Sequence, residues 1–288
     1  EIGDKELRGH FNALGRFDVA PGYDWGFDIR RTTDDTYLRR YDFSNDTLLT
    51  SRIYAETFDM PGSDRSYASI MGLAFQGLTV QDDQARIPLV LPLAAVSYQS
   101  DPWLYNSRFL LDGNFMSLTR DIGDKSRRLS TTAGWKLPYI SEDGQIVEFR
   151  TQLRGDIYNV EDVMLSSGTN FEGVPGRLLP QVSALWRYPF INRFESGSFM
   201  IEPVAMLAIS PGGGNPEKIP NEDSVAPEFT DTNLFDPNRF AGYDRVESGP
   251  RVAYGTRRPW PFFEAKYLGW LLGQPRLDEP LGRFASRA

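Results

Sequence analysis

The amino-acid sequence predicts an all-β fold, an antiparallel transmembrane β-barrel, on three observations. Apolar and polar side chains alternate along many segments, turn-forming residues separate these segments, and no apolar run is long enough for a spanning helix. The longest apolar run, residues 87–96, is about half of the roughly 20 residues that a spanning helix needs, and Pro88 and Pro92 interrupt it. A spanning strand needs only roughly 9 to 11 residues.

The alternation is clearest in residues 146–157. Val147, Phe149, Leu153 and Ile157 share one face of an extended chain, and the other face is charged or polar. The polar face carries Glu148, Arg150, Gln152, Arg154 and Asp156. A register slip of one residue would move two arginines into lipid at roughly 2 to 4 kcal/mol each, so a membrane barrel would fix these faces firmly.

Residues 105–120 divide in the same way over a length that exceeds the roughly 5 or 6 residues of a typical soluble strand. We therefore predict that a wet barrel lumen is lined by Arg108, Asp112, Glu148, Arg150, Arg154 and Asp156. Pairing of these arginines with the neighbouring carboxylates is the first expectation. Bidentate contact with the phosphates of a lipid is the alternative.

Further alternating segments follow in chain order and bring the expected number to roughly ten strands, with no convincing helix. They lie near residues 6–18, 23–31, 46–59, 66–79, 126–138, 177–188, 197–210 and 244–255. Residues 60–65 and 141–145 have the composition of tight turns. Pro138, Pro189 and Pro203 are expected at strand ends or bulges, because proline removes a donor from the ladder.

Aromatic residues gather near the predicted strand ends, as in the belts at the two interfaces of a membrane. They are Trp103, Tyr105, Trp135, Tyr139, Trp186, Tyr188 and Phe190. A soluble β-sandwich or propeller also alternates its faces, so it stays open as an alternative.

Composition excludes several classes of function. The 288 residues include 39 acidic and 31 basic ones, a net charge of -8, which argues against a general nucleic-acid binder. The chain has no cysteine, and this excludes thiolate catalysis, disulfides and thiolate metal sites. It begins at Glu1 without a signal-peptide pattern, so we expect that a signal peptide was removed or lies upstream and that the sequence is a fragment.

Residues 215–249 hold eight carboxylates in thirty-five positions. Their spacing does not match a calcium-binding loop, and we predict no metal site and no cofactor. Paired catalytic acids remain an alternative. We expect a long extracellular loop that returns into a strand near Tyr243, with its carboxylates placed for Arg239, Arg245 or bridging cations. His10, the only histidine, has no serine nearby in its segment and is expected to be a lone lumen residue.

Four blocks of sequence resemble the LptD family of lipopolysaccharide-assembly outer-membrane proteins, in its alphaproteobacterial branch. They are RGHFNALGRFDV at residues 8–19, DDTYLRRYDF at 34–43, the block 115–139, and an acidic loop within residues 219–249. The resemblance covers about residues 8–255. The signature residues of the loop are Pro220, Asn221, Glu222, Asp223, Ser224, Asn233, Phe235, Arg239, Phe240, Gly242, Tyr243, Asp244 and Arg245.

The resemblance implies a transporter and not an enzyme. Members form a very large barrel in the outer membrane of Gram-negative bacteria, with an N-terminal periplasmic jelly roll and an LptE-like lipoprotein plug. Lipopolysaccharide arrives through periplasmic bridge proteins that contact the N-terminal domain, and it enters the outer leaflet through a lateral seam. The chain would then be an internal fragment of the barrel, without the jelly roll and the seam strands. A passive outer-membrane porin or a soluble β-rich scaffold is the alternative.

If the chain is a barrel fragment, its sequence divides into two parts. Residues 1–255 are predicted to belong to the barrel. Residues 256–288 lack alternation and are predicted to be irregular. The phrase LLGQPRLDEP departs from the family's pattern, and we interpret it as a frame disruption near residues 256–275 or a truncation.

Overall fold

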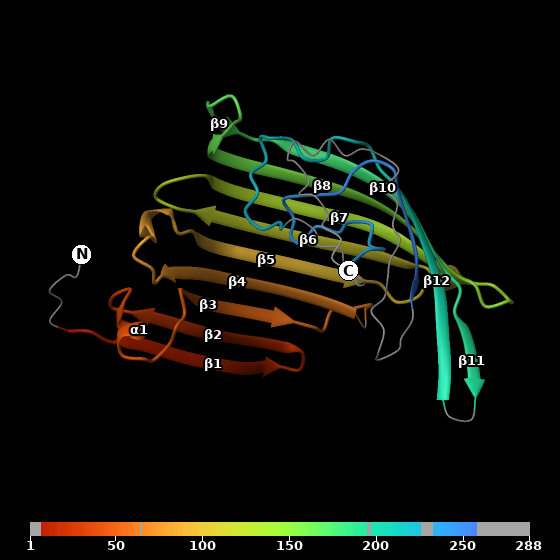
Figure 1. Ribbon diagram of the computed structural model, residues 1–288, viewed down its shortest axis with the longest axis horizontal. Helices are drawn as coiled ribbons and strands as arrows, with labels where there is room; N and C mark the ends of the chain where they lie inside the picture. The colour runs from red at the N-terminus through yellow and green to blue at the C-terminus, as the bar shows by residue number, and fades with distance from the viewer. Residues whose placement is uncertain (1–6, 64, 195–196, 226–232, 258–288) are drawn as a thin grey trace, which may run out of the picture.

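In the computed structural model, residues 7–63, 65–194, 197–225 and 233–257 are described, and they form one antiparallel sheet of thirteen strands (Figure 1). The all-β prediction is confirmed. Helical structure in these residues is limited to the one-turn α1 (Tyr37–Arg40) and to 3-10 turns at Gln84–Arg86 and Leu104–Asn106. Within the same residues, no helix is long and apolar enough to cross a membrane.

The strands follow one another in the sheet almost in chain order, as expected when short connections join antiparallel neighbours. β12 lies beside β10 and β11 on one side and β13 on the other, and β9 pairs with the end of β8. The described sheet is open, with β1 at one edge and β13 at the other. The strand bounds are β1 His10–Ala20, β2 Tyr23–Thr32, β3 Leu48–Thr57, β4 Arg65–Gly77, β5 Leu89–Gln99, β6 Arg108–Thr119, β7 Lys125–Ile140, β8 Ile146–Met164, β9 Asn170–Gly173, β10 Gly176–Arg187, β11 Phe190–Phe194, β12 Gly197–Ile209 and β13 Arg251–Arg257.

The predicted number of roughly ten strands was too low, because three strands carry no clear alternation. β5 has apolar side chains on both faces and holds Pro92 beside a register shift between Val90 and Leu93, so it does not show period two. β9 and β11 have only 4 and 5 residues. β13 begins at Arg251 and not near residue 244, because the preceding residues bond to the loop instead of to a strand.

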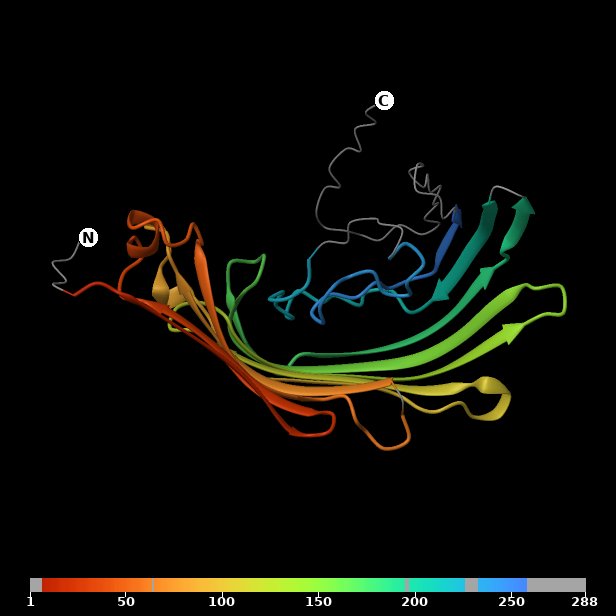
Figure 2. The ribbon, with the colours of Figure 1, turned by 90° about the horizontal axis from the view of Figure 1, so that it is seen from below.

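The sheet curves into a trough, and residues 210–225 and 233–250 lie on its concave side (Figure 2). We call these residues the inner loop. On β8, Leu153 and Ile157 are 47% and 52% exposed on the convex face, whereas Arg154 and Asp156 are 8% and 5% exposed on the concave face. The period-two pattern thus gives an apolar outer surface and a polar inner surface that the inner loop covers.

Two of the four apolar core clusters in the described residues lie between the inner loop and the sheet. Leu234 and Phe235 of the loop pack on Val204, Met206 and Ala208 of β12. In a second cluster, Ile219 of the loop packs on Tyr158, Val160 and Val163 of β8. Burial of these side chains stabilises the loop in place, since each fully buried aliphatic side chain contributes roughly 1.5 to 3 kcal/mol.

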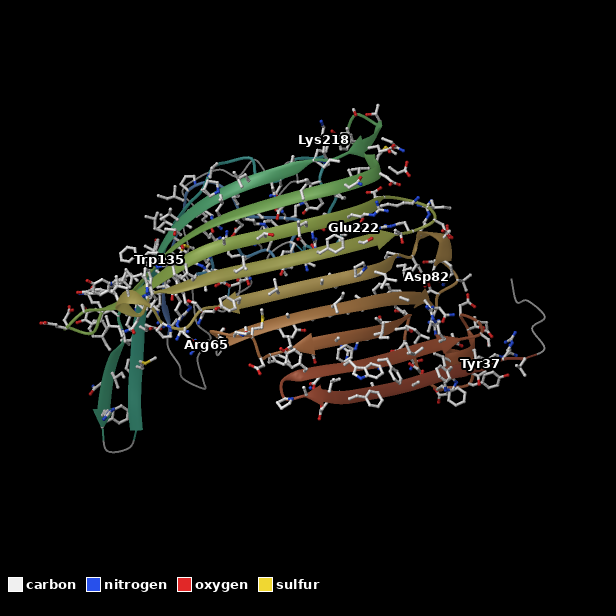
Figure 3. All side chains as sticks on the ribbon, turned by 180° about the vertical axis from the view of Figure 1, so that it is seen from behind. Tyr37, Arg65, Asp82, Trp135, Lys218 and Glu222 are labelled. Carbon is white, nitrogen blue, oxygen red and sulfur yellow. The ribbon has the colours of Figure 1, made fainter. Side chains whose placement is uncertain are left out.

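The two ends of the sheet differ in their connections. One end, the loop-rich end, carries residues 33–47, 78–88, 210–225 and 233–250, and the loop-poor end carries short connections such as 21–22 and 141–145. Trp135 lies at the opposite end of the sheet from Tyr37 and Asp82 (Figure 3).

The aromatic residues assigned from sequence to two interfaces all lie at or near the loop-poor end, so the prediction of two belts from these residues was wrong. Ring pairs form there, including Tyr188 with Phe190 at 4.3 Å and Trp103 with Phe109 at 5.7 Å between centroids. Tyr37, Tyr41 and Phe43, which the sequence did not single out, form a second group of aromatic rings at the loop-rich end.

Candidate functional site: the inner loop and its anchor

The two arms of the inner loop hold each other at their base. The side-chain amide of Asn215 donates to the carbonyl of Val246 at 2.8 Å and accepts from its N–H at 2.9 Å. Glu247 accepts from the Arg239 Nε at 2.8 Å and also pairs with Arg251, the first residue of β13. These bonds close the loop between β12 and β13 and direct its central part onto the sheet.

Arg128 of β7 and Asp244 of the loop form the centre of the anchor, and each side chain is 1% exposed. The Arg128 Nη1 donates to the Asp244 Oδ1 at 2.6 Å, and Tyr158 of β8 donates its hydroxyl to the same oxygen at 3.1 Å. The backbone N–H groups of Glu222 and Asp223 donate to the Asp244 Oδ2 at 2.8 and 3.1 Å. Both charges are therefore neutralised and hydrogen-bonded, the condition under which a buried ion pair is tolerated.

Asp223 is the second carboxylate at Arg128, with 2.8 Å between its Oδ2 and the Nη1. Its Oδ1 accepts the backbone N–H groups of Tyr243 and Asp244, each at 3.0 Å. Burial raises the pKa of Asp223, but Arg128 and these two N–H groups together hold it below its usual value. Gly242 makes this arrangement possible: its φ is +84°, and a Cβ there would lie 2.4 Å from the Asp223 carbonyl oxygen.

Two arginines of the sheet, Arg177 and Arg154, bind the backbone of the same segment. Arg177 of β10 donates to the carbonyl oxygens of Asp244 at 2.9 Å and Tyr243 at 2.6 Å. Arg154 also donates to the Tyr243 carbonyl, and its Nε lies 3.0 Å from Asp156, which pairs with Arg177 as well. The Tyr243 ring lies under Arg128, 5.1 Å from its guanidinium carbon. The sheet therefore binds both the side chains and the carbonyl groups of Tyr243 and Asp244.

A further ion pair ties the loop to the turn between β6 and β7. The Arg120 Nη2 lies 2.6 Å from Glu222, and both side chains are 16% exposed. Burial raises the pKa of Glu222, and Arg120 opposes this shift.

The anchor brings together only part of the predicted site. Glu222, Asp223 and Asp244 contact the sheet residues Arg120 and Arg128. The expected pairing of a loop carboxylate with Arg239 is formed by Glu247. Arg245 donates to the Ile219 carbonyl at 2.9 Å. The other signature residues support the loop: Asn221 and Ser224 bond to each other, Phe235 enters the core, and Pro220, Asn233 and Phe240 are at least half-buried.

The six residues predicted to line the lumen all lie on the concave face of the sheet, on β6 and β8. Their role in a lumen stays a prediction. Arg154 and Asp156 pair with each other under the inner loop. Arg108 donates to the Ser100 carbonyl at 3.0 Å, and Asp112 accepts from Ser97 at 2.8 Å. Glu148 and Arg150 are half-buried farther along β8. The His10 ring contacts the tilted rings of Phe43 and Tyr37, with 4.8 and 5.8 Å between centroids.

Sequence reasoning missed Arg120, Arg128, Tyr158 and Arg177. Alternation could have placed Arg128 on the concave face of β7, because Arg128 shares that face with Ser126 and Ser130, whereas Leu129 faces outward. No sequence signal predicted that this face would meet a loop more than 90 residues away, since the partner was expected on the extracellular side.

The chemistry of the anchor is structural. Each of the three central carboxylates accepts bonds from arginine or backbone N–H groups, so none is free to act as a general base. Within the described residues, no group of three or more side chains is arranged to hold a metal ion.

The pKa of Asp223 predicts acid sensitivity. Its folded value lies below the ordinary 3.8, so its stabilisation of the loop is present above that pH and is lost as the pH falls through the folded value. Spin labels on cysteines placed at Val225 and Ile140 should give a narrow distance distribution at pH 5 to 7 that broadens below about pH 4. Asp223→Asn should broaden it at neutral pH, and an unchanged distribution in both cases would contradict the assignment.

Comparison with known proteins gives one family. The model of LptD, LPS transport system D, matches residues 6–274. Among curated proteins no match is found.

Proposed function

The chain belongs to the LptD family, and from this premise we propose that it forms part of the barrel of an outer-membrane translocon that inserts lipopolysaccharide into the outer leaflet. Membership implies a lipid transport protein that handles lipopolysaccharide at the outer membrane of Gram-negative bacteria. The family match over residues 6–274 is the observation that carries the proposal, and it favours transport over a passive porin or a soluble scaffold.

The two faces of the sheet support this proposal. Leu153 and Ile157 belong to an exposed apolar convex face, as a surface against lipid requires. The concave face is polar, and we propose that Arg108, Asp112, Glu148 and Arg150 line the lumen beyond the inner loop. The anchored inner loop lies across this side of the sheet (Figure 2) and would restrict passive diffusion.

The partners follow from the proposed role. We propose an LptE-like lipoprotein plug inside the barrel and periplasmic bridge proteins that deliver lipopolysaccharide through an N-terminal domain. Neither a catalytic step nor a cofactor is needed at the barrel.

We also propose that residues 1–255 belong to the barrel and that residues 256–288 form a separate irregular segment. Residues 258–288 lie outside the described part of the chain. Translation of the source DNA in all three frames tests the proposed frame disruption: strands with period two should occur in another frame downstream of about residue 256, and their absence would contradict it.

The proposed function is tested by photo-crosslinking at two adjacent threonines of β7. Thr132 lies on the concave face and Thr131 on the convex face. The two positions therefore differ in the side they face but lie at almost the same level of the sheet. In the full-length protein in membranes with an active lipopolysaccharide bridge, a photoreactive residue at position 132 should crosslink lipopolysaccharide only while energy is supplied. At position 131 the crosslinks should not depend on energy. No energy-dependent crosslink at 132 during measured transport would contradict the proposal.

A further inference from the structure

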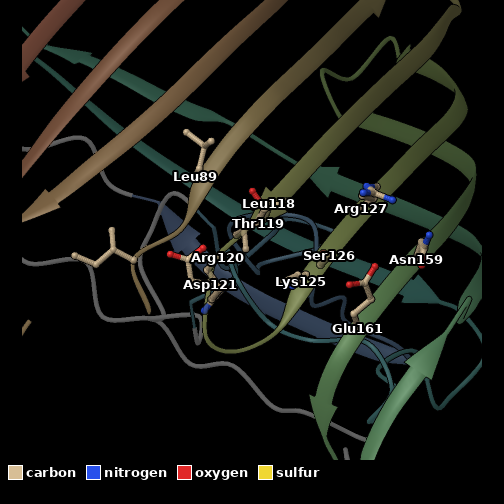
Figure 4. Close-up of a pocket in the computed structure, with 11 residues that line it drawn as sticks. Leu89, Leu118, Thr119, Arg120, Asp121, Lys125, Ser126, Arg127, Asn159 and Glu161 are labelled. Atoms are coloured by element: carbon tan, nitrogen blue, oxygen red, sulfur yellow. The ribbon is translucent and has the colours of Figure 1, made fainter. Parts of the chain in front are cut away.

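A pocket opens at the loop-rich end of the sheet, across β5 to β8 (Figure 4). Its volume is about 510 Å³, within the roughly 300 to 1,000 Å³ of pockets that hold small ligands. Its lining includes Leu89, Asp121, Lys125, Arg127, Asn159 and Glu161.

Strand register places this pocket at the edge of the apolar convex face. Lys125 stands opposite Glu161, Arg127 opposite Asn159, and Leu129 opposite Ile157, so successive convex positions of β7 run from charged to apolar. Each step of two residues covers about 7 Å. Arg127 therefore lies one step beyond Leu129, which is 48% exposed. In a membrane this is the level of the lipid headgroups at the loop-rich boundary.

Two cations of the pocket are not committed to protein partners. Among the described residues, no ion pair or side-chain hydrogen bond engages Lys125 or Arg127. Arg120, by contrast, is held by Glu222 at 2.6 Å on the concave side. The other charges in the pocket are Asp121 and Glu161. The available charges thus balance, and a free anion from solution gains little from the pocket.

A lipid with a phosphorylated headgroup fits these features. A guanidinium and an ammonium two residues apart bind phosphate oxygens through charge-assisted hydrogen bonds. Leu129 offers an exposed apolar surface for an acyl chain one step below Arg127, and Leu89 flanks the pocket at the level of Lys125. The acyl chain supplies the affinity that a charge-balanced pocket does not give to a free anion.

We propose that this pocket holds a phosphorylated glycolipid of the outer leaflet, with its phosphate at Arg127 and Lys125 and an acyl chain along Leu129. The proposal rests on the proposed function, because it requires the convex face to lie in the outer membrane. The site is on the outside of the barrel and not on the concave face. Its occupant is a resident lipid beside the translocon and not the lipopolysaccharide that moves through it.

The test measures lipid retained by the full-length protein in nanodiscs that contain lipopolysaccharide and phospholipid, by native mass spectrometry. Arg127→Gln together with Lys125→Gln should lower retained lipopolysaccharide about tenfold, as expected for loss of charge-assisted bonds to phosphate. Dephosphorylated lipopolysaccharide should be retained as weakly by the unchanged protein. Arg86→Gln is the matched control, because Arg86 is an exposed cation in the neighbouring connection and does not line the pocket.

Other outcomes would overturn the assignment. Equal retention by the double variant and by Arg86→Gln would exclude the phosphate site. Preferential retention of phospholipid would exclude a glycolipid, and displacement by inorganic phosphate would show a site for a free anion. Heat-dependent gel mobility checks that the double variant folds. Energy-dependent crosslinking at position 132 reports on transport separately, so its loss with retained lipid would count against the proposed function alone.

Discussion

Asp244→Ala is expected to detach the inner loop and to destabilise the protein by about 3 to 5 kcal/mol, the range for removing one partner of a buried ion pair. Arg128 is 1% exposed and would keep only Asp223, at 2.8 Å, as a charged partner. Tyr158 and two backbone N–H groups would also lose their acceptor. Each buried group left without a partner adds roughly 1 to 3 kcal/mol, so the neighbouring Asp223 does not rescue the site.

Urea unfolding in detergent measures the loss, and spin labels at Val225 and Ile140 report whether the loop has moved. Glu142→Ala is the control, since Glu142 is exposed in the turn at residues 141–145 and should change stability by no more than about 0.5 kcal/mol. The double variant Asp244→Ala with Arg128→Met should recover part of the loss, because the fully buried guanidinium is gone and Asp223, which is 27% exposed, keeps two backbone N–H donors. If Asp244→Ala changed the free energy of unfolding no more than Glu142→Ala does, the ion pair would not stabilise the loop, and the proposed anchor would be wrong.

Leu153→Arg is expected to prevent or strongly weaken assembly into the membrane. Leu153 is 47% exposed on the convex face near the middle of β8, and an arginine facing lipid at the midplane costs roughly 2 to 4 kcal/mol. If the sheet were part of a soluble scaffold, the same change at an exposed position would stay within about 0.5 kcal/mol. The substitution therefore separates the two environments by its size.

The measurement is the fraction of full-length protein that becomes heat-modifiable in the outer membrane, together with its folding free energy into lipid vesicles. Met164→Arg provides the comparison on the same strand, because Met164 is 64% exposed at the loop-rich end of β8, where the cost falls to roughly 0 to 1 kcal/mol. Equal effects of the two substitutions would contradict a lipid-facing convex surface.

Alternation predicted most long strands because each has one wet face and one apolar face. β8 is the clearest case, since the parity read from its sequence is the one seen in the exposure of Leu153 and Arg154. β5 escaped prediction because both of its faces are apolar in sequence, and β9 and β11 are too short for a period to be counted.

The inner loop shows which of its features follow from its own sequence and which depend on residues distant in the chain. Its composition and its glycine predicted a long irregular connection, and this is what the chain forms. Its direction depended on a complementary set of arginines on β7, β8 and β10 that are distant in sequence. The extracellular position of this loop stays a prediction, and the bonds to the concave face are what direct it inward.

The sequence by itself determined the fold class, the two faces of the long strands and the family, because side-chain period and signature residues are local properties of the chain. The tertiary structure decided where the inner loop lies and which charges neutralise each other. The physical reason is that burial of Arg128 and Asp244 is tolerated only when both arrive at the same place with their remaining hydrogen bonds satisfied. That meeting depends on the curvature and register of the whole sheet.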